Sequence, residues 1–318
     1  MHRSSPVDGF SLAYTDTGRP TSGDHNRTAI LLHGWPGDST DYRRVIPLLR
    51  HSFRIIAPDL RGFGESDRHL LNPDIHYSPT AQARSIAGLI DELGLQHPVI
   101  AGYDVGSRIA QTLAREHPTC VGGLALSPPL PGSGARVLDE QIVPELWYMY
   151  FHRSPLSVAL LDGQRDKIHT YLRYFWQHLS GPEFTVDGAE FESLIDGYAR
   201  PGAFEAATNL YRVGNGYIAS ATTEQAPHPM DRITVPTHVL WQELDPLFPR
   251  AWSDRLGEFF ADITVHHVDG VGHFTPLEAP ADFASIVDAV YRAGIRRNTH
   301  VHRAFGESGA TIGRHPVT

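Results

Sequence analysis

The sequence predicts an α/β fold in which a mostly parallel sheet carries helices on both faces and a helical segment is inserted in the middle of the chain. Three observations predict it. Short apolar runs alternate with helix-like segments, these runs do not switch regularly between polar and apolar residues, and one long stretch holds helix signals only. Strands buried on both faces of a parallel sheet have this nearly continuous apolar character, and strand–helix alternation is typical of doubly wound sheets.

Six apolar runs are the expected strands: 29–33, 54–57, 98–101, 121–126, 238–241 and 263–268. The clearest helix spans residues 78–94. Ser78 is a favourable N-cap, Pro79 suits the first helical position, and Gly94 suits the end of the helix. Helical spacing of apolar residues also predicts helices at 107–117 and 281–294.

The alternation stops at the Pro/Gly-rich segment 128–132. From there to residue 231 aromatic and apolar residues recur at helical spacing, and strand signals resume near residue 235. We therefore expect a core built from residues 1–129 and 232–296, a helical cap built from residues 130–231, and a flexible C-terminal tail at residues 297–318. The expected cap helices are 146–151, 171–179, 191–198 and 204–211.

Composition and charge narrow the function. The 318 residues carry a formal net charge of −9, which disfavours binding to nucleic acid or to an anionic membrane surface. The single cysteine, Cys120, excludes an intramolecular disulfide and a cysteine-based zinc site. No signal-peptide pattern opens the sequence and no run of 18 apolar residues occurs. These features predict a cytoplasmic protein that binds neither nucleic acid nor a membrane.

The first chemical motif is GYDVG at residues 102–106, between an expected strand and an expected helix. It has the form of a nucleophile elbow, a tight turn that lifts its central side chain above the edge of the sheet, with Asp104 in place of the usual serine. The glycines permit the strained backbone of such a turn. An ordinary turn in which Asp104 caps the following helix is the alternative.

Two further segments lie at strand ends. HGWPG at residues 33–37 follows the strand 29–33, where such a turn can supply a backbone N–H to an oxyanion hole, so Trp35 and Val105 are the expected donors. His273, in the loop GVGHF after the last strand, is the expected histidine partner. Asp245, after the strand 238–241, is the expected acid, with Glu243 as its rival.

These motifs, together with DLRGFGES at residues 59–66, make the chain resemble the α/β-hydrolase superfamily over about residues 8–295. The resemblance is to the group that includes epoxide hydrolases and dehalogenases and uses an aspartate nucleophile. It implies an α/β-hydrolase fold, a catalytic triad of Asp104, Asp245 and His273, a small apolar substrate, and water as co-substrate. It implies no cofactor and no metal, and it leaves the oligomeric state open, with a homodimer among the options.

An aspartate nucleophile selects the substrate class. A carboxylate is charged at neutral pH and can displace a leaving group from an sp³ carbon, which gives an alkyl ester on the enzyme. Water activated by His273, with Asp245 orienting the imidazole, would then hydrolyse the ester. The expected substrates are therefore epoxides or alkyl halides.

The leaving group separates these two chemistries. An epoxide oxygen needs acid groups, which the resemblance implies are tyrosines of the cap, and Tyr211 matches one of them. In the second cap segment Trp147 stands where the pattern has tyrosine, and an indole N–H cannot deliver a proton. Tyr148 is one place away, so either residue could face Asp104, and we take Tyr148 as the second acid. The expected lining of the substrate pocket is Trp147, Tyr150, Phe151 and Phe274.

The halide alternative rests on fewer matches. Haloalkane dehalogenases usually place Asn in the turn that here holds Trp35, or Trp at the position of Val105. Fluoroacetate dehalogenases place Arg at the position of Val105, and only their second Arg is matched here, by Arg108. The leading hypothesis is therefore a hydrolase that opens an epoxide to a vicinal diol. A hydrolytic dehalogenase acting on haloalkanes or haloacids is the alternative, and a ligand-binding member of the superfamily is a third.

Overall fold

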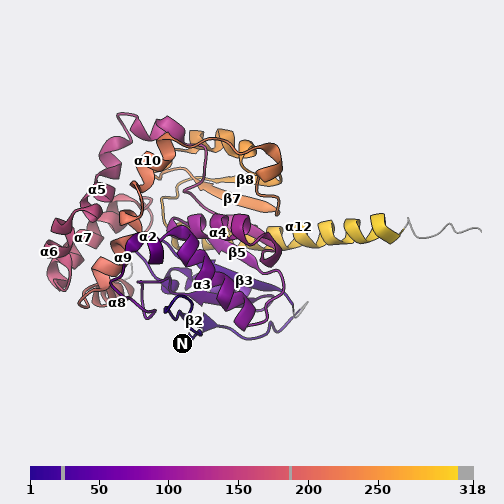
Figure 1. The fold of residues 1–318 in the computed structure, drawn as a ribbon, viewed down its shortest axis with the longest axis horizontal. Coiled ribbons are helices and arrows are strands. Elements are labelled where there is room, and N and C mark those ends of the chain that lie inside the picture. Colours follow the sequence, from indigo (N-terminus) through magenta and orange to yellow (C-terminus); the bar gives the residue numbers. More distant parts are fainter. Residues whose placement is uncertain (23–25, 186–187, 307–318) are drawn as a thin grey trace, which may run out of the picture.

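A single mixed sheet organises the fold (Figure 1). Within residues 1–22, 26–185 and 188–306, which the computed structural model describes, eight strands lie in the order β1-β2-β4-β3-β5-β6-β7-β8, and side chains are described as far as residue 295. The strands are β1 (His2–Arg3), β2 (Ala13–Asp16), β3 (Thr28–Leu32), β4 (Arg54–Pro58), β5 (Val99–Gly102), β6 (Gly123–Leu126), β7 (Thr237–Gln242) and β8 (Ile263–Val268).

The sheet is parallel from β4 to β8, and β1 and β2 are antiparallel additions at one edge. The predicted fold class is confirmed, and the six expected strands are present within two residues of their predicted ends. The sequence missed β1 and β2 because two and four residues at a partly exposed edge are too few to show a period.

Twelve α-helices are present in the described residues. They are α1 (Ile46–Leu49), α2 (Pro73–His76), α3 (Pro79–Glu92), α4 (Val105–Glu116), α5 (Trp147–Arg153), α6 (Pro155–Leu161), α7 (Arg165–His178), α8 (Gly188–Tyr198), α9 (Ala203–Arg212), α10 (Gly216–Thr222), α11 (Thr275–Glu278) and α12 (Pro280–Gly306). Short 3₁₀ turns connect them: η1 (Ser39–Tyr42), η2 (Pro118–Cys120), η3 (Gly134–Leu138), η4 (Val143–Leu146), η5 (Pro229–Asp231) and η6 (Arg250–Glu258).

Helix α3 has the predicted ends. The Ser78 side chain accepts a hydrogen bond from the backbone N–H of Ala81, Pro79 is the first helical residue, and Gly94 follows the helix with a φ of +60°. A positive φ is easily adopted by glycine, which is why the helix stops there.

Two glycines show that helices cover both faces of the sheet. A Cβ on Gly102 would clash with the start of α4, and a Cβ on Gly123 would lie 2.4 Å from a methyl group of Val290 in α12. Gly123 pairs with Val99, three residues before Gly102, so the two glycines point to opposite faces because successive residues of a strand alternate. Helices α4 and α12 therefore pack on opposite sides of β5 and β6.

Residues 130–231, which lie between β6 and β7, form the insertion. Its described residues hold helices α5 to α10 and no strand, as predicted, and these helices group at one side of the sheet in Figure 1. Helices α6 and α10 were not predicted. The division of the chain into a core and a separate cap domain stays a prediction.

The first part of the predicted tail is helical. Helix α12 continues through residues 297–306 and projects away from the rest of the chain in Figure 1, and the flexibility of the tail stays a prediction. Extending a helix that has already formed avoids the cost of nucleation, and no proline interrupts the chain in this stretch. The rest of the predicted tail, residues 307–318, lies outside the described residues. No helix in the described part of the chain is both long enough and apolar enough to cross a membrane.

Candidate active site

Asp104 lies in a strained turn between β5 and α4. Its backbone has φ +46° and ψ −123°, a conformation that costs a non-glycine residue about 1–3 kcal/mol. The turn is also crowded, because a Cβ on Gly106 would lie 2.0 Å from the carbonyl oxygen of Leu32. The Asp104 side chain makes no capping hydrogen bond to α4. The structure thus contradicts the helix-cap alternative and leaves the carboxylate available for another role.

One of the two predicted backbone donors holds the Asp104 carboxylate. The N–H of Trp35 donates to Oδ2 at 2.7 Å, and the N–H of Val105, the second predicted donor, lies next to the carboxylate in the chain. The side chain is 13% exposed. Burial raises the pKa of Asp104 above its usual value, while the positive charge of His273 and the two N–H groups act to lower it. The geometry therefore supports the ionised form against the effect of burial.

His273 lies in the loop between β8 and α11, beside Asp104. Its Nδ1 is 2.8 Å from Oδ2 of Asp245, and its Nε2 is 4.0 Å from Oδ1 of Asp104. Burial alone would lower the pKa of His273, but the charge and hydrogen bond of Asp245, followed by the charge of Asp104, raise it to about 9. A pKa of about 9 keeps the imidazole of His273 protonated at neutral pH.

This raised pKa predicts a loss of stability in alkaline solution. The pKa of histidine in an unfolded chain is about 6.5. The contribution of His273 to the free energy of unfolding is fully present below about pH 6.5 and is lost as the pH rises through about 9. The expected loss is on the order of 3 kcal/mol. Urea unfolding from about pH 6 to about pH 10 measures it. The same series on His273→Gln should lack this component, and an identical alkaline loss in both proteins would contradict the prediction.

Asp245 is the acid that the structure pairs with His273. The side-chain amide of Gln242 donates to its Oδ2 at 2.6 Å, and the backbone N–H of Leu247 donates to its Oδ1 at 2.8 Å. The rival Glu243 is exposed and accepts a hydrogen bond from the N–H of Gly270. Gln242 was missed at the sequence level, although a glutamine at the end of a buried strand three residues before the acid was a usable signal.

Two tyrosines of the insertion lie together near Asp104. Tyr148 is 3% and Tyr211 is 9% exposed, and their ring centroids are 5.7 Å apart. The Trp35 indole stacks on Tyr148 at 5.6 Å and meets the Tyr211 ring edge-on at 5.7 Å. Burial raises the pKa of both tyrosines well above the usual value, and the negative charge of Asp104 raises both further. Both hydroxyls therefore stay protonated at neutral pH, and the charge of the Asp104 carboxylate acts on both.

The structure decides which residue of the aromatic segment turns inward. Tyr148 packs on Trp35, whereas Trp147 and Tyr150 are 41% and 63% exposed, so the expectation that these two line the pocket is not supported. On helix α5 they lie on a different face from Tyr148, because neighbouring positions are about 100° apart around a helix. Phe151 is half-buried against Tyr171.

The fourth expected pocket residue, Phe274, is fully buried. Its ring lies 5.3 Å from the ring of His273 and stacks on Trp176 at 3.9 Å. Phe274 therefore packs beside the histidine and against the end of α7. The structure shows it as a support of the loop that carries His273.

His152 is a buried residue that the sequence did not single out. It lies one turn after Tyr148 on α5, its ring centroid is 4.7 Å from that of Tyr211, and its Nε2 is 2.9 Å from the Tyr171 hydroxyl.

Arg212 of α9 donates to the carbonyl of His152 at 3.0 Å, and Arg153 of α5 donates to the carbonyl of Tyr211 at 2.7 Å. These reciprocal bonds fix the helix carrying Tyr148 against the helix carrying Tyr211.

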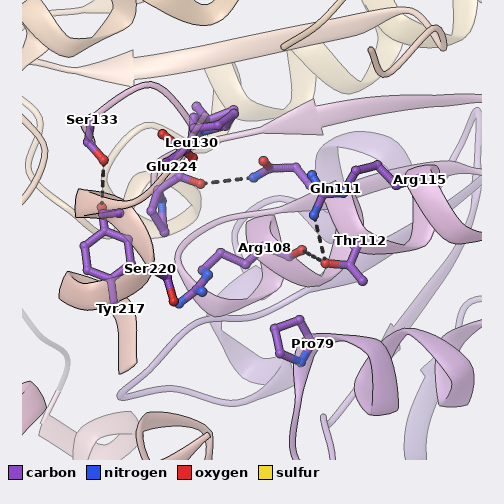
Figure 2. A pocket seen from close by; sticks show the side chains of 13 residues that line it. Pro79, Arg108, Gln111, Thr112, Arg115, Leu130, Ser133, Tyr217, Ser220 and Glu224 are labelled. Carbon is purple, nitrogen blue, oxygen red and sulfur yellow. Dashed lines mark hydrogen bonds between the residues drawn. The ribbon is translucent and has the colours of Figure 1, made fainter. Parts of the chain in front are cut away.

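Two neighbouring cavities lie between α4 and α10. One, of about 280 Å³, is lined by residues that include Val105, Ile109 and Leu210. The other, of about 190 Å³, is more polar and is shown in Figure 2. Arg108 and Tyr217 border both, and the Arg108 guanidinium lies 5.3 Å from the centre of the Tyr217 ring. Val105, the residue after Asp104, borders the first cavity.

The sheet, the strained turn after β5 and the histidine loop after β8 together define the class of α/β-hydrolases. The chain belongs to the family described as alpha/beta hydrolase fold, which matches residues 29–280. The protein is therefore a hydrolase, and its relatives include epoxide hydrolases and dehalogenases.

Three comparisons give the scale of the similarity. The chain is 27% identical over 290 residues to the soluble epoxide hydrolase of Corynebacterium sp. (strain C12), covering 88% of this chain and 93% of that protein. It is 26% identical over 215 residues to the fluoroacetate dehalogenase of Burkholderia sp., covering 65% and 70%. The crystal structure of Bacillus megaterium epoxide hydrolase with an inhibitor matches with a TM-score of 0.74 at 19% identity, covering 92% and 100%, which is a likeness of fold alone.

Proposed function

We propose that this enzyme opens an epoxide to a vicinal diol, with Asp104 as the nucleophile. The observation that carries the proposal is the pair of buried tyrosines, Tyr148 and Tyr211, which pack on the ring of Trp35, the residue whose backbone N–H holds Asp104. The oxygen of an opening epoxide gains negative charge and needs hydrogen-bond donors or a proton, which phenols can supply. The insertion would then act as the cap that carries these acids.

The first step forms an ester. Oδ2 of Asp104 is held by the Trp35 N–H, which leaves Oδ1, on the His273 side, to attack a ring carbon of the epoxide. The carbon–oxygen bond of the epoxide breaks, and its oxygen takes a proton from Tyr148 or Tyr211. The product is a hydroxyalkyl ester of Asp104.

The second step needs His273 as a base. The charge of Asp104 is one of the causes that raise the pKa of His273, and ester formation removes that charge. The change favours the neutral imidazole, which can take a proton from the water that attacks the ester carbonyl. Negative charge then develops on Oδ2, to which the N–H of Trp35 already donates, and the N–H of Val105 is the second expected donor. Each such donor is typically worth about 3–4 kcal/mol in the transition state. The Cγ–Oδ1 bond then breaks, and the leaving oxygen of the diol takes a proton from His273. Asp104, released as a carboxylic acid, gives its proton back to His273, and the phenolate of the first step takes the proton that His273 released on ester formation.

A hydrolytic dehalogenase is the second candidate. It is favoured by the indole N–H of Trp35, which is buried beside both tyrosines and has no hydrogen-bond partner among the described residues. Such a donor suits a halide, which needs no proton. The similarity to a fluoroacetate dehalogenase supports the same candidate.

Removing the tyrosine hydroxyls tests the choice. Each of Tyr148→Phe and Tyr211→Phe should lower the rate of ester formation from an epoxide by about 10- to 100-fold, and the double variant by more, because general acid catalysis typically contributes about 10²–10⁴-fold. Single-turnover mixing with an aryl epoxide, followed by intact-protein mass spectrometry, measures ester formation and decay separately. The decay rate should stay the same.

Tyr150→Phe is the matched control, because Tyr150 lies on the same helix with its side chain in solvent, and it should leave both rates unchanged. Undiminished epoxide opening in the double variant would contradict the role of the tyrosines. Release of halide from a haloalkane or haloacid panel, without diol from any epoxide, would select the dehalogenase instead.

A further inference from the structure

Glu278, at the end of α11, is a carboxylate that the chemistry above does not use. It accepts hydrogen bonds from three backbone N–H groups. Gly272 and Gly181 donate to Oε2 at 2.8 and 2.7 Å, and Phe274 donates to Oε1 at 2.9 Å. Gly272 and Phe274 are the two neighbours of His273. A single side chain therefore holds the backbone on both sides of the histidine, with hydrogen bonds that the charge of the acceptor strengthens.

The third donor belongs to the insertion. Gly181 lies just after α7, and the chain there touches the histidine loop at two further points. The backbone N–H of His273 donates to the carbonyl of Leu179 at 2.7 Å, and the Trp176 ring stacks on Phe274 at 3.9 Å with an angle of 8° between the planes. The end of α7 and the side chain of Glu278 therefore contact the loop that carries His273 from two sides.

Two glycines allow the backbone after α7 and the backbone of the His273 loop to pack closely against each other. A Cβ on Gly272 would lie 2.3 Å from the carbonyl oxygen of Leu179, and a Cβ on Gly181 would lie 2.5 Å from the carbonyl oxygen of Gly270. Neither segment can carry a larger residue without moving the other. A backbone N–H left without a partner in such a contact costs about 1–3 kcal/mol, so losing the Glu278 acceptor should shift the loop.

We infer that Glu278 is a positioning residue for His273, and that through it the end of α7 sets the distance between the base and the ester on Asp104. This inference rests on the proposed function for its second step. Ester formation uses Asp104 and the tyrosines, whereas ester hydrolysis depends on where Nε2 of His273 lies. The effect of Glu278 should therefore fall mainly on hydrolysis.

Glu278→Gln tests the inference, because its amide nitrogen cannot accept the hydrogen bonds of the carboxylate oxygen that it replaces. Ester formation and decay are followed by intact-protein mass spectrometry in a single turnover with an aryl epoxide. The decay rate is taken from the alkylated fraction only, so that unfolded protein does not enter it. We expect formation within about 3-fold of the wild type and decay about 10²-fold slower, the cost typical of a misplaced catalytic group.

Glu243→Gln is the matched control. Glu243 also accepts a backbone N–H of this loop, that of Gly270, but it is exposed, and its replacement should leave both rates unchanged. Glu278→Asp keeps the charge and shortens the side chain, and it should slow decay as Glu278→Gln does.

Three outcomes would overturn the inference. Unchanged decay in Glu278→Gln, or equal slowing of formation and decay, would exclude a specific role in hydrolysis. Normal decay in Glu278→Asp would show that charge alone matters and not position. Wild-type enzyme that never forms an ester would instead contradict the proposed function, and with it the step assigned to His273.

Discussion

Asp104→Asn should abolish nearly all turnover of an epoxide, with a fall in kcat of about 10⁴-fold or more. The amide of Asn is a far weaker nucleophile than a carboxylate, and removal of a nucleophile in other hydrolases costs about 10⁶-fold. The fold should persist, because the amide oxygen can still accept the N–H of Trp35. Diol formation followed by chromatography measures the loss, and a circular dichroism spectrum checks the fold.

Isotope labelling of the wild-type enzyme tests the same covalent intermediate on Asp104. In a single turnover in ¹⁸O water the label should enter the carboxylate of Asp104, because water attacks the carbonyl carbon of the ester and the diol keeps an original oxygen of Asp104. Asp269→Asn is a matched control, since Asp269 lies near His273 in sequence with a side chain that is 80% exposed, and it should retain full activity. Label found only in the diol after a single turnover, or a fully active Asp104→Asn, would exclude the covalent route.

His273→Gln should separate the two chemical steps. Ester formation should continue, because Asp104 and the tyrosines remain, but hydrolysis should slow by about 10²–10⁴-fold without a general base. The alkylated enzyme should therefore accumulate and be visible as a mass increase equal to one substrate molecule. The measurement is intact-protein mass spectrometry during incubation with excess epoxide.

The control for this variant is His267→Gln, because His267 is an exposed histidine on β8 a few residues earlier in the chain. It should neither trap an ester nor slow turnover. If His273→Gln turned over at the wild-type rate, another group would have to activate the water, and the assignment of His273 would fail.

In the proposed mechanism the insertion has two separate roles. Helices α5 and α9 bring Tyr148 and Tyr211 to the leaving oxygen, and they are joined by the reciprocal bonds of Arg153 and Arg212. The end of α7 instead touches the loop of His273. A change in the insertion could therefore alter ester formation through one part and ester hydrolysis through another.

Much of the core could be predicted because its signals are local. The strand at residues 99–102, the glycines of the turn around Asp104 and the loop of His273 are each written in a few consecutive residues. The ends of parallel strands meet at one edge of a sheet, so the order of these motifs was enough to expect Asp104, Asp245 and His273 to lie together. The 2.8 Å contact between His273 and Asp245 agrees with that expectation.

The parts that the sequence left open depend on residues far apart in the chain. Which of Trp147 and Tyr148 faces Trp35 is set by the rotation of a seven-residue helix, and a small rotation exchanges neighbouring side chains. Glu278 gains its role only where Gly181, nearly a hundred residues earlier, comes to lie against it. The sequence by itself determined the sheet, the order of its motifs and the membership of the α/β-hydrolase superfamily. Only the tertiary structure decided which side chains surround Asp104, because packing between helices of the insertion and loops of the core is fixed by three-dimensional contact and not by local pattern.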